Sequence, residues 1–393
     1  MEITIFPKIP ERSIAADLFN RIAWGLYGTE CLTVFYQPLD QQGWESDSTF
    51  PVPDSQALFL TSEQLPKFQQ RSGVNAEEEL LESSERILVW KVSALQEKVL
   101  KAWKDKVIVV DPEYCLNHEA DQIAALQFLL MTEDKKSALR KQSLEKYSQF
   151  MRQHANVGQA CLFLTGPSLQ QVLKFSQPQD SVRIICNSLV KDHTLLEAIQ
   201  PHILTFSDPA YHFGVSRYAE AFRKEVGAAL EQYTELVCVI PERYLPMMQA
   251  YYGHEMDERL IGMPLVEQDQ FNFPEPICYY CRFTGNILTQ FMLPIASQIS
   301  RCVNIYGADG RQPEDAGFWK HNPTAQMGEL LSTIYATHPS LARDENVAEY
   351  YQTHCDTLEM LFRYGERFGI SYHSATPSYI PALARRMANK RTD

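Results

Sequence analysis

The chain has 393 residues, of which 45% are hydrophobic and 22% charged, a composition typical of a folded globular protein. Its formal net charge of −13 excludes duplex nucleic acid as a partner, because binding to the phosphate backbone requires a basic surface. The length suits two domains, which we expect at residues 1–155 and 156–393.

The first 155 residues carry the pattern of a small α/β domain. An amphipathic helix is predicted at Ser13–Gly25. Short apolar runs predict strands at Cys31–Tyr36, Ala57–Thr61, Arg86–Trp90 and Lys106–Val110. A helix predicted at Ser93–Lys104 joins the last two strands into a βαβ unit. From His118 to Ala155 the pattern is helical, and we expect this segment to bridge the first domain, on the acceptor side, to the second.

Strand and helix patterns alternate from Gln159 onward. Strands are predicted at Cys161–Leu164, Arg183–Cys186, Ile203–Phe206, Leu236–Ile240, Cys302–Tyr306 and Ile370–His373. Helices are predicted at Leu169–Lys174, Tyr218–Tyr233, Ile287–Ile299, Pro323–Tyr335 and Glu345–Phe368. This alternation predicts an α/β fold with a mostly parallel, doubly wound sheet. The whole chain would then hold two Rossmann-like domains in a GT-B-like arrangement, with a cleft between them.

Small polar clusters follow the apolar strands of the second domain. In Thr165-Gly166-Pro167-Ser168 the glycine allows close backbone approach, and the serine can cap a helix whose amino end attracts an anion. Asn187 and Asp208 end the next two strands. Because ligands bind outside the carboxyl ends of parallel strands, these side chains would form one rim of a nucleoside site. Each cluster alone is also explained by an ordinary turn.

Two later clusters extend this pattern. Thr284 and Gly285 precede a helix, where they would either cap it or turn its amino end towards a phosphate. Gly307 and Asp309 follow the apolar strand VNIY. Asp309 would bind a substrate hydroxyl, act as a base or simply hold the loop. The loop that follows, up to Asn322, is long enough to serve as an active-site lid.

The same loop and the helix after it carry the candidates for proton and phosphate chemistry. Lys320 and His321 stand beside aromatic residues and suit an anionic sugar or a leaving phosphate. His354 lies in a predicted helix and His338 lies before it. A neutral imidazole near an acceptor hydroxyl is the usual base for group transfer to an alcohol, although a lone histidine in a helix is more often structural.

Cysteine spacing and targeting patterns limit the remaining choices. Nine cysteines at irregular spacing indicate free thiols in a reducing compartment. Cys278 and Cys281 form one CxxC without a second pair, and no DxD pair ends a strand, so no metal is expected. No signal pattern or membrane span of roughly 18 apolar residues is present. We expect a cytoplasmic protein, with at most a peripheral contact between the basic segment Ala384–Asp393 and the inner face of the membrane.

Taken in order, these motifs resemble those of the bacterial sialyltransferases typified by the Campylobacter lipooligosaccharide enzymes, and of their relatives of unknown function. The resemblance covers residues 159–383 and leaves out the first 150. The matching segments are Gly166-Pro167-Ser168-Leu169, Cys186-Asn187, Ser207-Asp208-Pro209, Thr284-Gly285, Gly307-Ala308-Asp309 and Pro377-Ser378.

The resemblance implies a domain that binds a CMP-activated sugar without metal or other cofactor and transfers the sugar with inversion. The residues that would bind the nucleotide are Thr165, Gly166, Pro167, Ser168, Asn187, Asp208, Thr284, Gly285, Gly307, Thr376 and Ser378. Lys320 and His321 would bind the phosphate of the donor. His354 lies nearest to the position of the family's base, and His338 is the reserve.

The chain also departs from the family pattern. Leu164 and Thr165 replace Gly-Asn, Asp208 replaces an asparagine, and the lid has no clearly placed pair of tyrosines. The donor sugar therefore stays open between sialic acid, another nonulosonic acid and Kdo, and the acceptor between a glycan and a lipid-linked sugar. If the reaction retains configuration, Asp208 or Asp309 would be the nucleophile.

Two other interpretations stay open. One is a phosphotransferase similar to the archaeal enzymes that transfer diphosphate to a pterin, which would require magnesium and acidic ligands. The other is a non-catalytic module for surface-glycan or flagellar assembly with a degenerate site, which the substituted turn at Leu164 and Thr165 favours.

Overall fold

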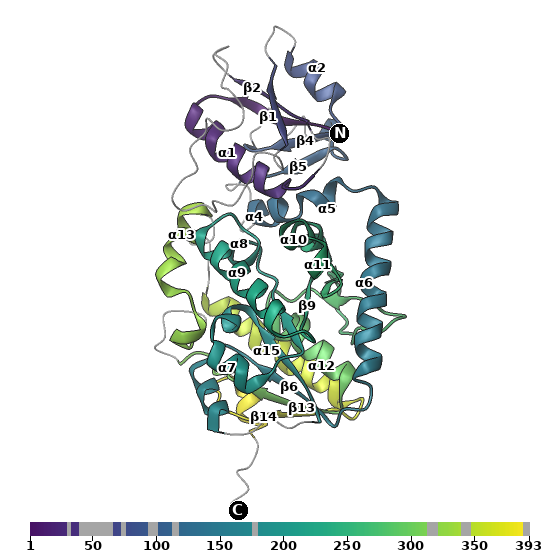
Figure 1. The fold of residues 1–393 in the computed structure, drawn as a ribbon, viewed down its shortest axis with the longest axis vertical. Coiled ribbons are helices and arrows are strands. Elements are labelled where there is room, and N and C mark those ends of the chain that lie inside the picture. Colours follow the sequence, from purple (N-terminus) through teal and green to yellow (C-terminus); the bar gives the residue numbers. More distant parts are fainter. Residues whose placement is uncertain are drawn as a thin grey trace, which may run out of the picture.

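The structure is a computed structural model. It describes residues 1–29, 33–38, 66–71, 76–92, 101–111, 118–174, 180–312, 321–338 and 347–387. Its described strands form a five-stranded sheet, a seven-stranded sheet and a two-stranded ribbon, all with parallel pairing. In Figure 1 the five-stranded sheet lies at the top and the seven-stranded sheet at the bottom. The predicted α/β class with mostly parallel sheets is confirmed, whereas the two domains divided at residue 155 and their GT-B-like arrangement stay predictions.

The five-stranded sheet has the order β3-β2-β1-β4-β5. Its elements are β1 (Glu2–Ile9), α1 (Arg12–Gly25), β2 (Thr33–Pro38), β3 (Lys67–Gln70), α2 (Ala76–Ser83), β4 (Arg86–Val89) and β5 (Val107–Val109). The sequence pattern does not predict β1, because proline is rare in central strands and Pro7 interrupts this one. The register between β1 and β2 shifts between Ile5 and Ile9, around Pro7. The strand expected at Ala57–Thr61 and most of the helix expected at Ser93–Lys104 lie outside the described residues.

The segment between the two sheets is broken into three helices. These are α4 (His118–Ala124), α5 (Leu126–Leu130) and α6 (Glu133–Gln153), where the sequence predicts one continuous helix. Met131 and Thr132 are extended, and the hydroxyl of Thr132 accepts a hydrogen bond from the backbone N of Lys135 and so caps α6. Figure 1 shows α6 running along one side of the molecule, from the region of α5 down to the larger sheet.

The seven-stranded sheet has the order β10-β9-β8-β7-β6-β13-β14. Its strands are β6 (Gln159–Phe163), β7 (Ser181–Cys186), β8 (Ile203–Thr205), β9 (Val237–Pro241), β10 (Leu260–Met263), β13 (Cys302–Tyr306) and β14 (Ser371–Ser374). The six strands predicted in this region are therefore confirmed to within a few residues. The strand β10, whose apolar run is interrupted by Gly262 and Pro264, and the two-residue strands β11 (Leu265–Val266) and β12 (Cys281–Arg282) were not predicted.

Helices connect these strands. The α-helices are α7 (His193–Ile199), α8 (Pro209–His212), α9 (Arg217–Gln232), α10 (Leu245–Tyr252), α11 (His254–Asp257), α12 (Leu293–Ile299), α13 (Leu331–Thr337), α15 (Val347–Glu366) and α16 (Pro381–Ala384). The 3-10 helices are η2 (Pro167–Lys174), η3 (Asn187–Lys191), η4 (Glu242–Tyr244), η6 (Pro323–Ala325) and η7 (Gly328–Leu330), and η5 (Leu288–Met292) is a π-helix. Among the described residues, no helix is both long enough and apolar enough to cross a membrane.

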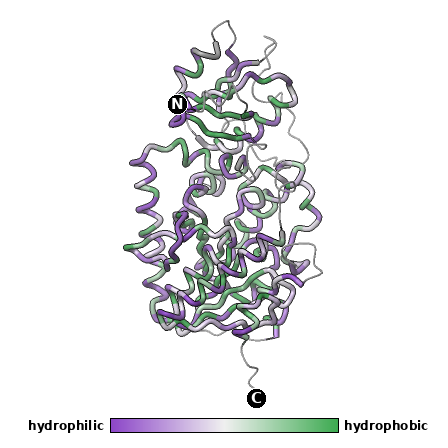
Figure 2. The backbone as a smooth tube through the Cα atoms, turned by 180° about the vertical axis from the view of Figure 1, so that it is seen from behind, coloured by the Kyte–Doolittle hydropathy of each residue, from purple (hydrophilic) through white to green (hydrophobic). Residues whose placement is uncertain are grey.

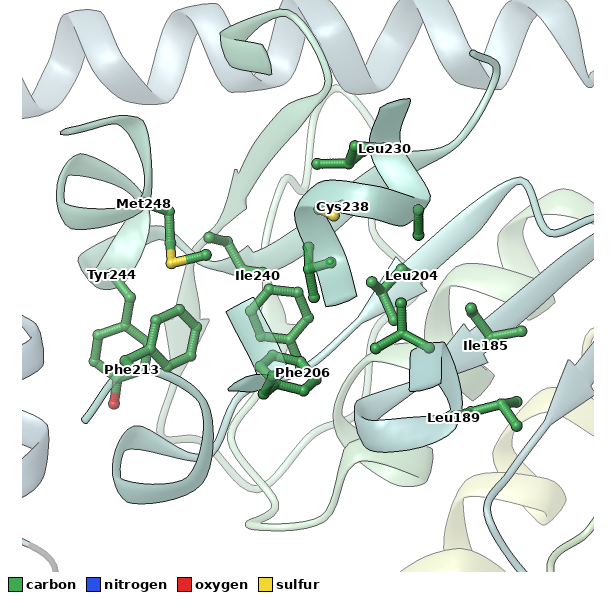
Figure 3. Close-up of a cluster of buried hydrophobic side chains, with 14 of the residues drawn as sticks. Ile185, Leu189, Leu204, Phe206, Phe213, Leu230, Cys238, Ile240, Tyr244 and Met248 are labelled. Atoms are coloured by element: carbon green, nitrogen blue, oxygen red, sulfur yellow. The ribbon is translucent and has the colours of Figure 1, made fainter. Parts of the chain in front are cut away.

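Two hydrophobic clusters cover the two faces of the larger sheet. Alternate residues of one strand face opposite sides, so Cys161 and Phe163 belong to one cluster and Ala160 and Leu162 to the other. Figure 2 shows the strands as some of the most hydrophobic parts of the chain. In Figure 3 the rings of Phe206 and Phe213 lie together, with Tyr244 beside Phe213. Burial on both faces explains why these strands are nearly continuous apolar runs, as the doubly wound sheet requires.

Candidate functional site

The larger sheet reverses its order of construction between β6 and β13. After β6 the chain adds β7 to β10 on one side, whereas β13 is followed by β14 on the other side. Ligands of open α/β sheets bind at such a switch point, outside the carboxyl ends of the strands. The turn after β6 holds Thr165–Ser168, and the turn after β13 holds Gly307–Gly310. The strand order therefore brings two of the predicted motifs together.

The two turns approach each other closely enough to require glycine. The backbone N of Gly166 donates to the carbonyl of Gly307 over 2.9 Å. A Cβ on Gly166 would lie 2.4 Å from that same carbonyl oxygen. Gly307 has φ +70, and a Cβ there would lie 2.6 Å from the carbonyl oxygen of Leu164. Both positions exclude a side chain, which explains the glycines of both motifs.

We expect Gly307→Ala to destabilise the protein more than an alanine at another position of similar φ. A left-handed alanine costs about 1–2 kcal/mol, and the contact with Leu164 adds about 1–3 kcal/mol of overpacking. Gly369→Ala is the matched control, since Gly369 has φ +76 and nothing within 4 Å of its would-be Cβ. Denaturant unfolding measures both variants. Equal losses in the free energy of unfolding would show that the close approach of the two turns adds no cost to an alanine at Gly307.

Asp309 ties the second turn to the first. Its carboxylate accepts a hydrogen bond from the backbone N of Ser168 over 2.8 Å and another, short one from the Ser168 hydroxyl. Ser168 Oγ lies 2.9 Å from Thr376 Oγ1, which also accepts from the backbone N of Gly307 over 2.9 Å. Burial raises the pKa of Asp309, and the two bonds from Ser168 oppose this rise. In this geometry both carboxylate oxygens hold the loop.

The protein's own carboxylate thus occupies the position predicted for a ligand anion. The backbone N–H groups of Gly166 and Ser168 donate to Gly307 and Asp309, and that of Leu169 donates to the carbonyl of Gly166. A phosphate would have to find its donors elsewhere. Ser378 belongs to the same assembly, because its hydroxyl donates to the carbonyl of Ala308 over 2.6 Å.

Thr165 contacts the segment that begins at His321 and holds it at the end of β6. Its hydroxyl lies 2.8 Å from Nδ1 of His321, and its carbonyl accepts from the backbone N of Asn322 over 2.6 Å. Burial lowers the pKa of His321, so its imidazole is neutral at neutral pH. His321 therefore lies at the switch point as a neutral hydrogen-bonding group. Lys320, the other predicted phosphate ligand, lies outside the described residues.

Asn187 and Asp208 follow β7 and β8, the next strands outward from β6. Asn187 has φ 50, a conformation that asparagine tolerates better than most residues. Asp208 caps α8, since its Oδ1 accepts hydrogen bonds of 2.9 Å from the backbone N atoms of Ala210 and Tyr211. The two residues thus stand at successive strand ends, where Asp208 caps a helix, and their part in the rim of a nucleoside site stays a prediction.

The amino-terminal end of α15 lies at the same edge of the sheet. The hydroxyl of Tyr351 accepts from the backbone N of Arg311, over 3.2 Å, just after the turn that follows β13. His354 lies one turn further along α15 and is 3% exposed. Burial lowers the pKa of His354 to about 4, so it is neutral at physiological pH. A depression of about 700 Å³ beside this edge is lined by residues that include Arg311, Tyr351, Tyr379 and Arg385.

Gly285 is bonded to α15 and Thr284 to η5, rather than to the two turns. The hydroxyl of Tyr350 donates a short hydrogen bond to the carbonyl of Gly285, which has φ +72. The hydroxyl of Thr284 lies 2.8 Å from that of Thr289. Among the described residues, no hydrogen bond joins Thr284 or Gly285 to Thr165, Ser168 or Asp309.

His338 lies in a different place from the other candidates. It is 2% exposed, and its Nδ1 lies 2.8 Å from Oε2 of Glu119, which also forms a short ion pair with Arg21. These residues come from the end of α13, from α4 and from α1. Burial raises the pKa of Glu119, but the charges and hydrogen bonds of Arg21 and His338 outweigh it and hold the pKa at about 2. The cluster is a buried contact between the amino-terminal part and the larger sheet's helices.

Sequence reasoning missed three residues of these networks. Asn322 had a usable signal, since it directly follows the predicted His321. Tyr351 and Glu119 had none, because their partners lie far away in the sequence. Among the described residues, no group of three or more His, Cys, Asp or Glu side chains could hold a metal ion.

No protein-family model matches the sequence, and no curated protein matches it either. Two solved structures share a distant likeness in fold. The sialyltransferase CstII of Campylobacter jejuni, solved with a substrate analogue, cytidine-5'-monophosphate, is 11% identical, with a TM-score of 0.29 over 58% of this chain and 87% of CstII. The monofunctional α-2,3-sialyltransferase Cst-I of the same species is 12% identical, with a TM-score of 0.27 over 58% of this chain and 79% of its own. Values this low assign no function, so a proposal has to rest on this chain's own residues.

Proposed function

We propose that this chain is a glycosyltransferase that moves an acidic sugar from a CMP-activated donor to a glycan or lipid-linked acceptor. The meeting of the Thr165–Ser168 and Gly307–Asp309 turns at the switch point of the larger sheet is the observation that carries the proposal. This is where an open α/β sheet binds a nucleotide. Polar side chains after β6, β7, β8, β13 and β14 surround the point, and the motif order that resembles sialyltransferases supplies the donor class.

The proposed reaction is a single displacement at the anomeric carbon. His354 takes the proton of the acceptor hydroxyl, and the acceptor oxygen bonds to the anomeric carbon. The bond between this carbon and the phosphate oxygen breaks, and CMP leaves with the electron pair. His321 would donate a hydrogen bond to the leaving phosphate, a role in which a fixed donor stabilises developing charge. Metal independence belongs to this proposal.

A thermal-shift titration with cytidine, uridine, guanosine and adenosine mono- and diphosphates tests the proposal. A ligand that binds only the folded state stabilises it by about 2.7 kcal/mol at a hundredfold excess over its Kd. We expect CMP to raise the melting temperature without magnesium, and more than the other monophosphates. Stabilisation only by a diphosphate with magnesium would instead favour phosphotransfer. No shift with any of them would favour the non-catalytic module.

A further inference from the structure

Asn322 has a buried side-chain amide whose nitrogen finds no partner among the described residues. The residue is 3% exposed and caps η6, where its Oδ1 accepts from the backbone N of Thr324 over 3.3 Å. Its backbone N donates to the carbonyl of Thr165. Its Nδ2 is buried and has no hydrogen-bond partner among the described residues. The side chain is therefore held by its oxygen while its two amide hydrogens stay unused.

Asn187, at the end of β7, has a buried acceptor where Asn322 has a buried donor. Its Oδ1 is buried and has no hydrogen-bond partner in the part of the chain that the structure describes. Asn187 adopts φ 50, a left-handed backbone conformation that glycine adopts at a lower steric cost than asparagine. A buried acceptor without a partner among the described residues needs an explanation, and a ligand that donates to Asn187 Oδ1 supplies one.

Both asparagines adjoin Thr165. Thr165 comes two residues after β6, and Asn187 directly follows β7, the strand that pairs with β6 in parallel. Adjacent parallel strands lie about 4.8 Å apart. Asn322 contacts Thr165 through its backbone, and η6 packs against η3, which begins at Asn187. One unused donor and one unused acceptor therefore flank the same strand end at the switch point.

We infer that Asn187 and Asn322 read the edge of a nucleobase. Buried polar atoms without partners cost free energy, and a ligand that pairs with both removes this cost. A base edge offers a donor beside an acceptor: in cytosine the exocyclic amino group would donate to Asn187 Oδ1, and the ring nitrogen would accept from Asn322 Nδ2. This assignment rests on the proposed function and adds to it a residue pair that holds the base rather than the sugar or phosphate.

Two variants remove these atoms with little disturbance of the fold. Asn187→Gly deletes Oδ1, and glycine is the residue that best suits φ 50. Asn322→Asp keeps an oxygen to cap Thr324 but replaces the amide donor by an acceptor. Asn272→Asp is the control: its Nδ2 donates to the carbonyl of Tyr280 in the loop before β12, so it loses an amide donor away from the strand ends.

The experiment compares affinities for CMP and for ribose 5-phosphate, which lacks a base. We expect Asn187→Gly and Asn322→Asp each to weaken CMP binding by about 10- to 100-fold and to leave ribose 5-phosphate binding unchanged, while Asn272→Asp changes neither. Unchanged CMP affinity, or an equal loss for both ligands, overturns the inference while the proposed function stands. A wild-type protein that binds no CMP overturns the proposed function itself, and that measurement comes first.

Discussion

Replacing His354 by alanine should reduce sugar transfer by about 10²- to 10⁴-fold while CMP affinity stays within about twofold of the wild type. The imidazole is the only part of the proposed mechanism that removes the acceptor proton, and it makes no proposed contact with the nucleotide. Initial rates with a CMP-activated acidic sugar, together with CMP titration of the same preparation, measure both quantities.

The pH profile gives an independent check on His354. Burial lowers its pKa to about 4, and a base acts in its deprotonated form. On the acidic side of the pH profile, the transfer rate should therefore be constant above about pH 5 and fall as the pH drops through about 4. An ordinary histidine would make the rate fall near pH 6.5 instead. A fall near pH 6.5 would assign the proton transfer to a different group.

His254→Ala is the matched control, because His254 is exposed on α11. It should leave both transfer and CMP binding unchanged. Since His354 is 3% exposed, the unfolding free energy of its variant has to be measured as well. Unchanged turnover in His354→Ala eliminates it as the base, and a parallel loss of CMP affinity makes its role structural.

Replacing Glu119 by alanine should lower the free energy of unfolding by about 3–5 kcal/mol. The change leaves Arg21 and His338 buried without the carboxylate that both contact. Arg21 keeps its ion pair with the exposed Asp17, but its guanidinium loses the buried carboxylate that offsets its desolvation, so this variant should be much worse than the loss of a surface pair. Chemical denaturation at pH 7, followed by intrinsic fluorescence, gives the difference.

Glu133→Ala is the control for Glu119→Ala. Glu133 pairs with Lys136, but its side chain is 88% exposed, so its loss should cost far less stability than the loss of Glu119. Similar costs for the two variants would mean that the buried cluster does not stabilise the fold.

The pH dependence of this stabilisation has a definite sign. The pKa of Glu119 in the folded protein is about 2, below the value of about 4.3 expected in the unfolded chain. A depressed pKa contributes stability that is fully present above the unfolded value and is lost as the pH falls through the folded one. The difference in stability between wild type and Glu119→Gln should therefore be constant near neutral pH and shrink between about pH 4 and pH 2.

Much of the fold could be predicted from local patterns. The strands around Leu162, Ile184 and Ile305 are apolar runs bounded by turn residues, and the structure confirms them. Local patterns failed where a neighbour overrides them. Pro7 interrupts the strand pattern of β1, so the pattern did not predict this strand. In the structure the pairing of β1 with β2 continues past Pro7 after a shift of register between Ile5 and Ile9. The extended Met131 and Thr132 divide a segment whose helical periodicity is otherwise continuous.

The candidate site was predictable in its residue types but not in its contacts. Thr165, Gly166, Ser168, Gly307 and Asp309 each stand in a turn after a strand, as the sequence indicates. That Asp309 binds Ser168, and so takes the place expected for a ligand anion, depends on β13 lying next to β6. Only the family resemblance ranks His354 above His338 in the sequence, whereas the structure pairs His338 with Glu119 and buries His354 within α15.

The sequence by itself determined the alternation of apolar strands and helices, the parallel α/β class and the turns in which glycine, serine and asparagine follow a strand. These properties depend on periodicity and on turn chemistry, which act over a few residues. Only the tertiary structure decided that β13 inserts between β6 and β14, which of the turns meet, and which buried polar atoms stay without a partner. Strand pairing across more than a hundred residues depends on how both faces of the sheet are covered, and no local pattern contains that information.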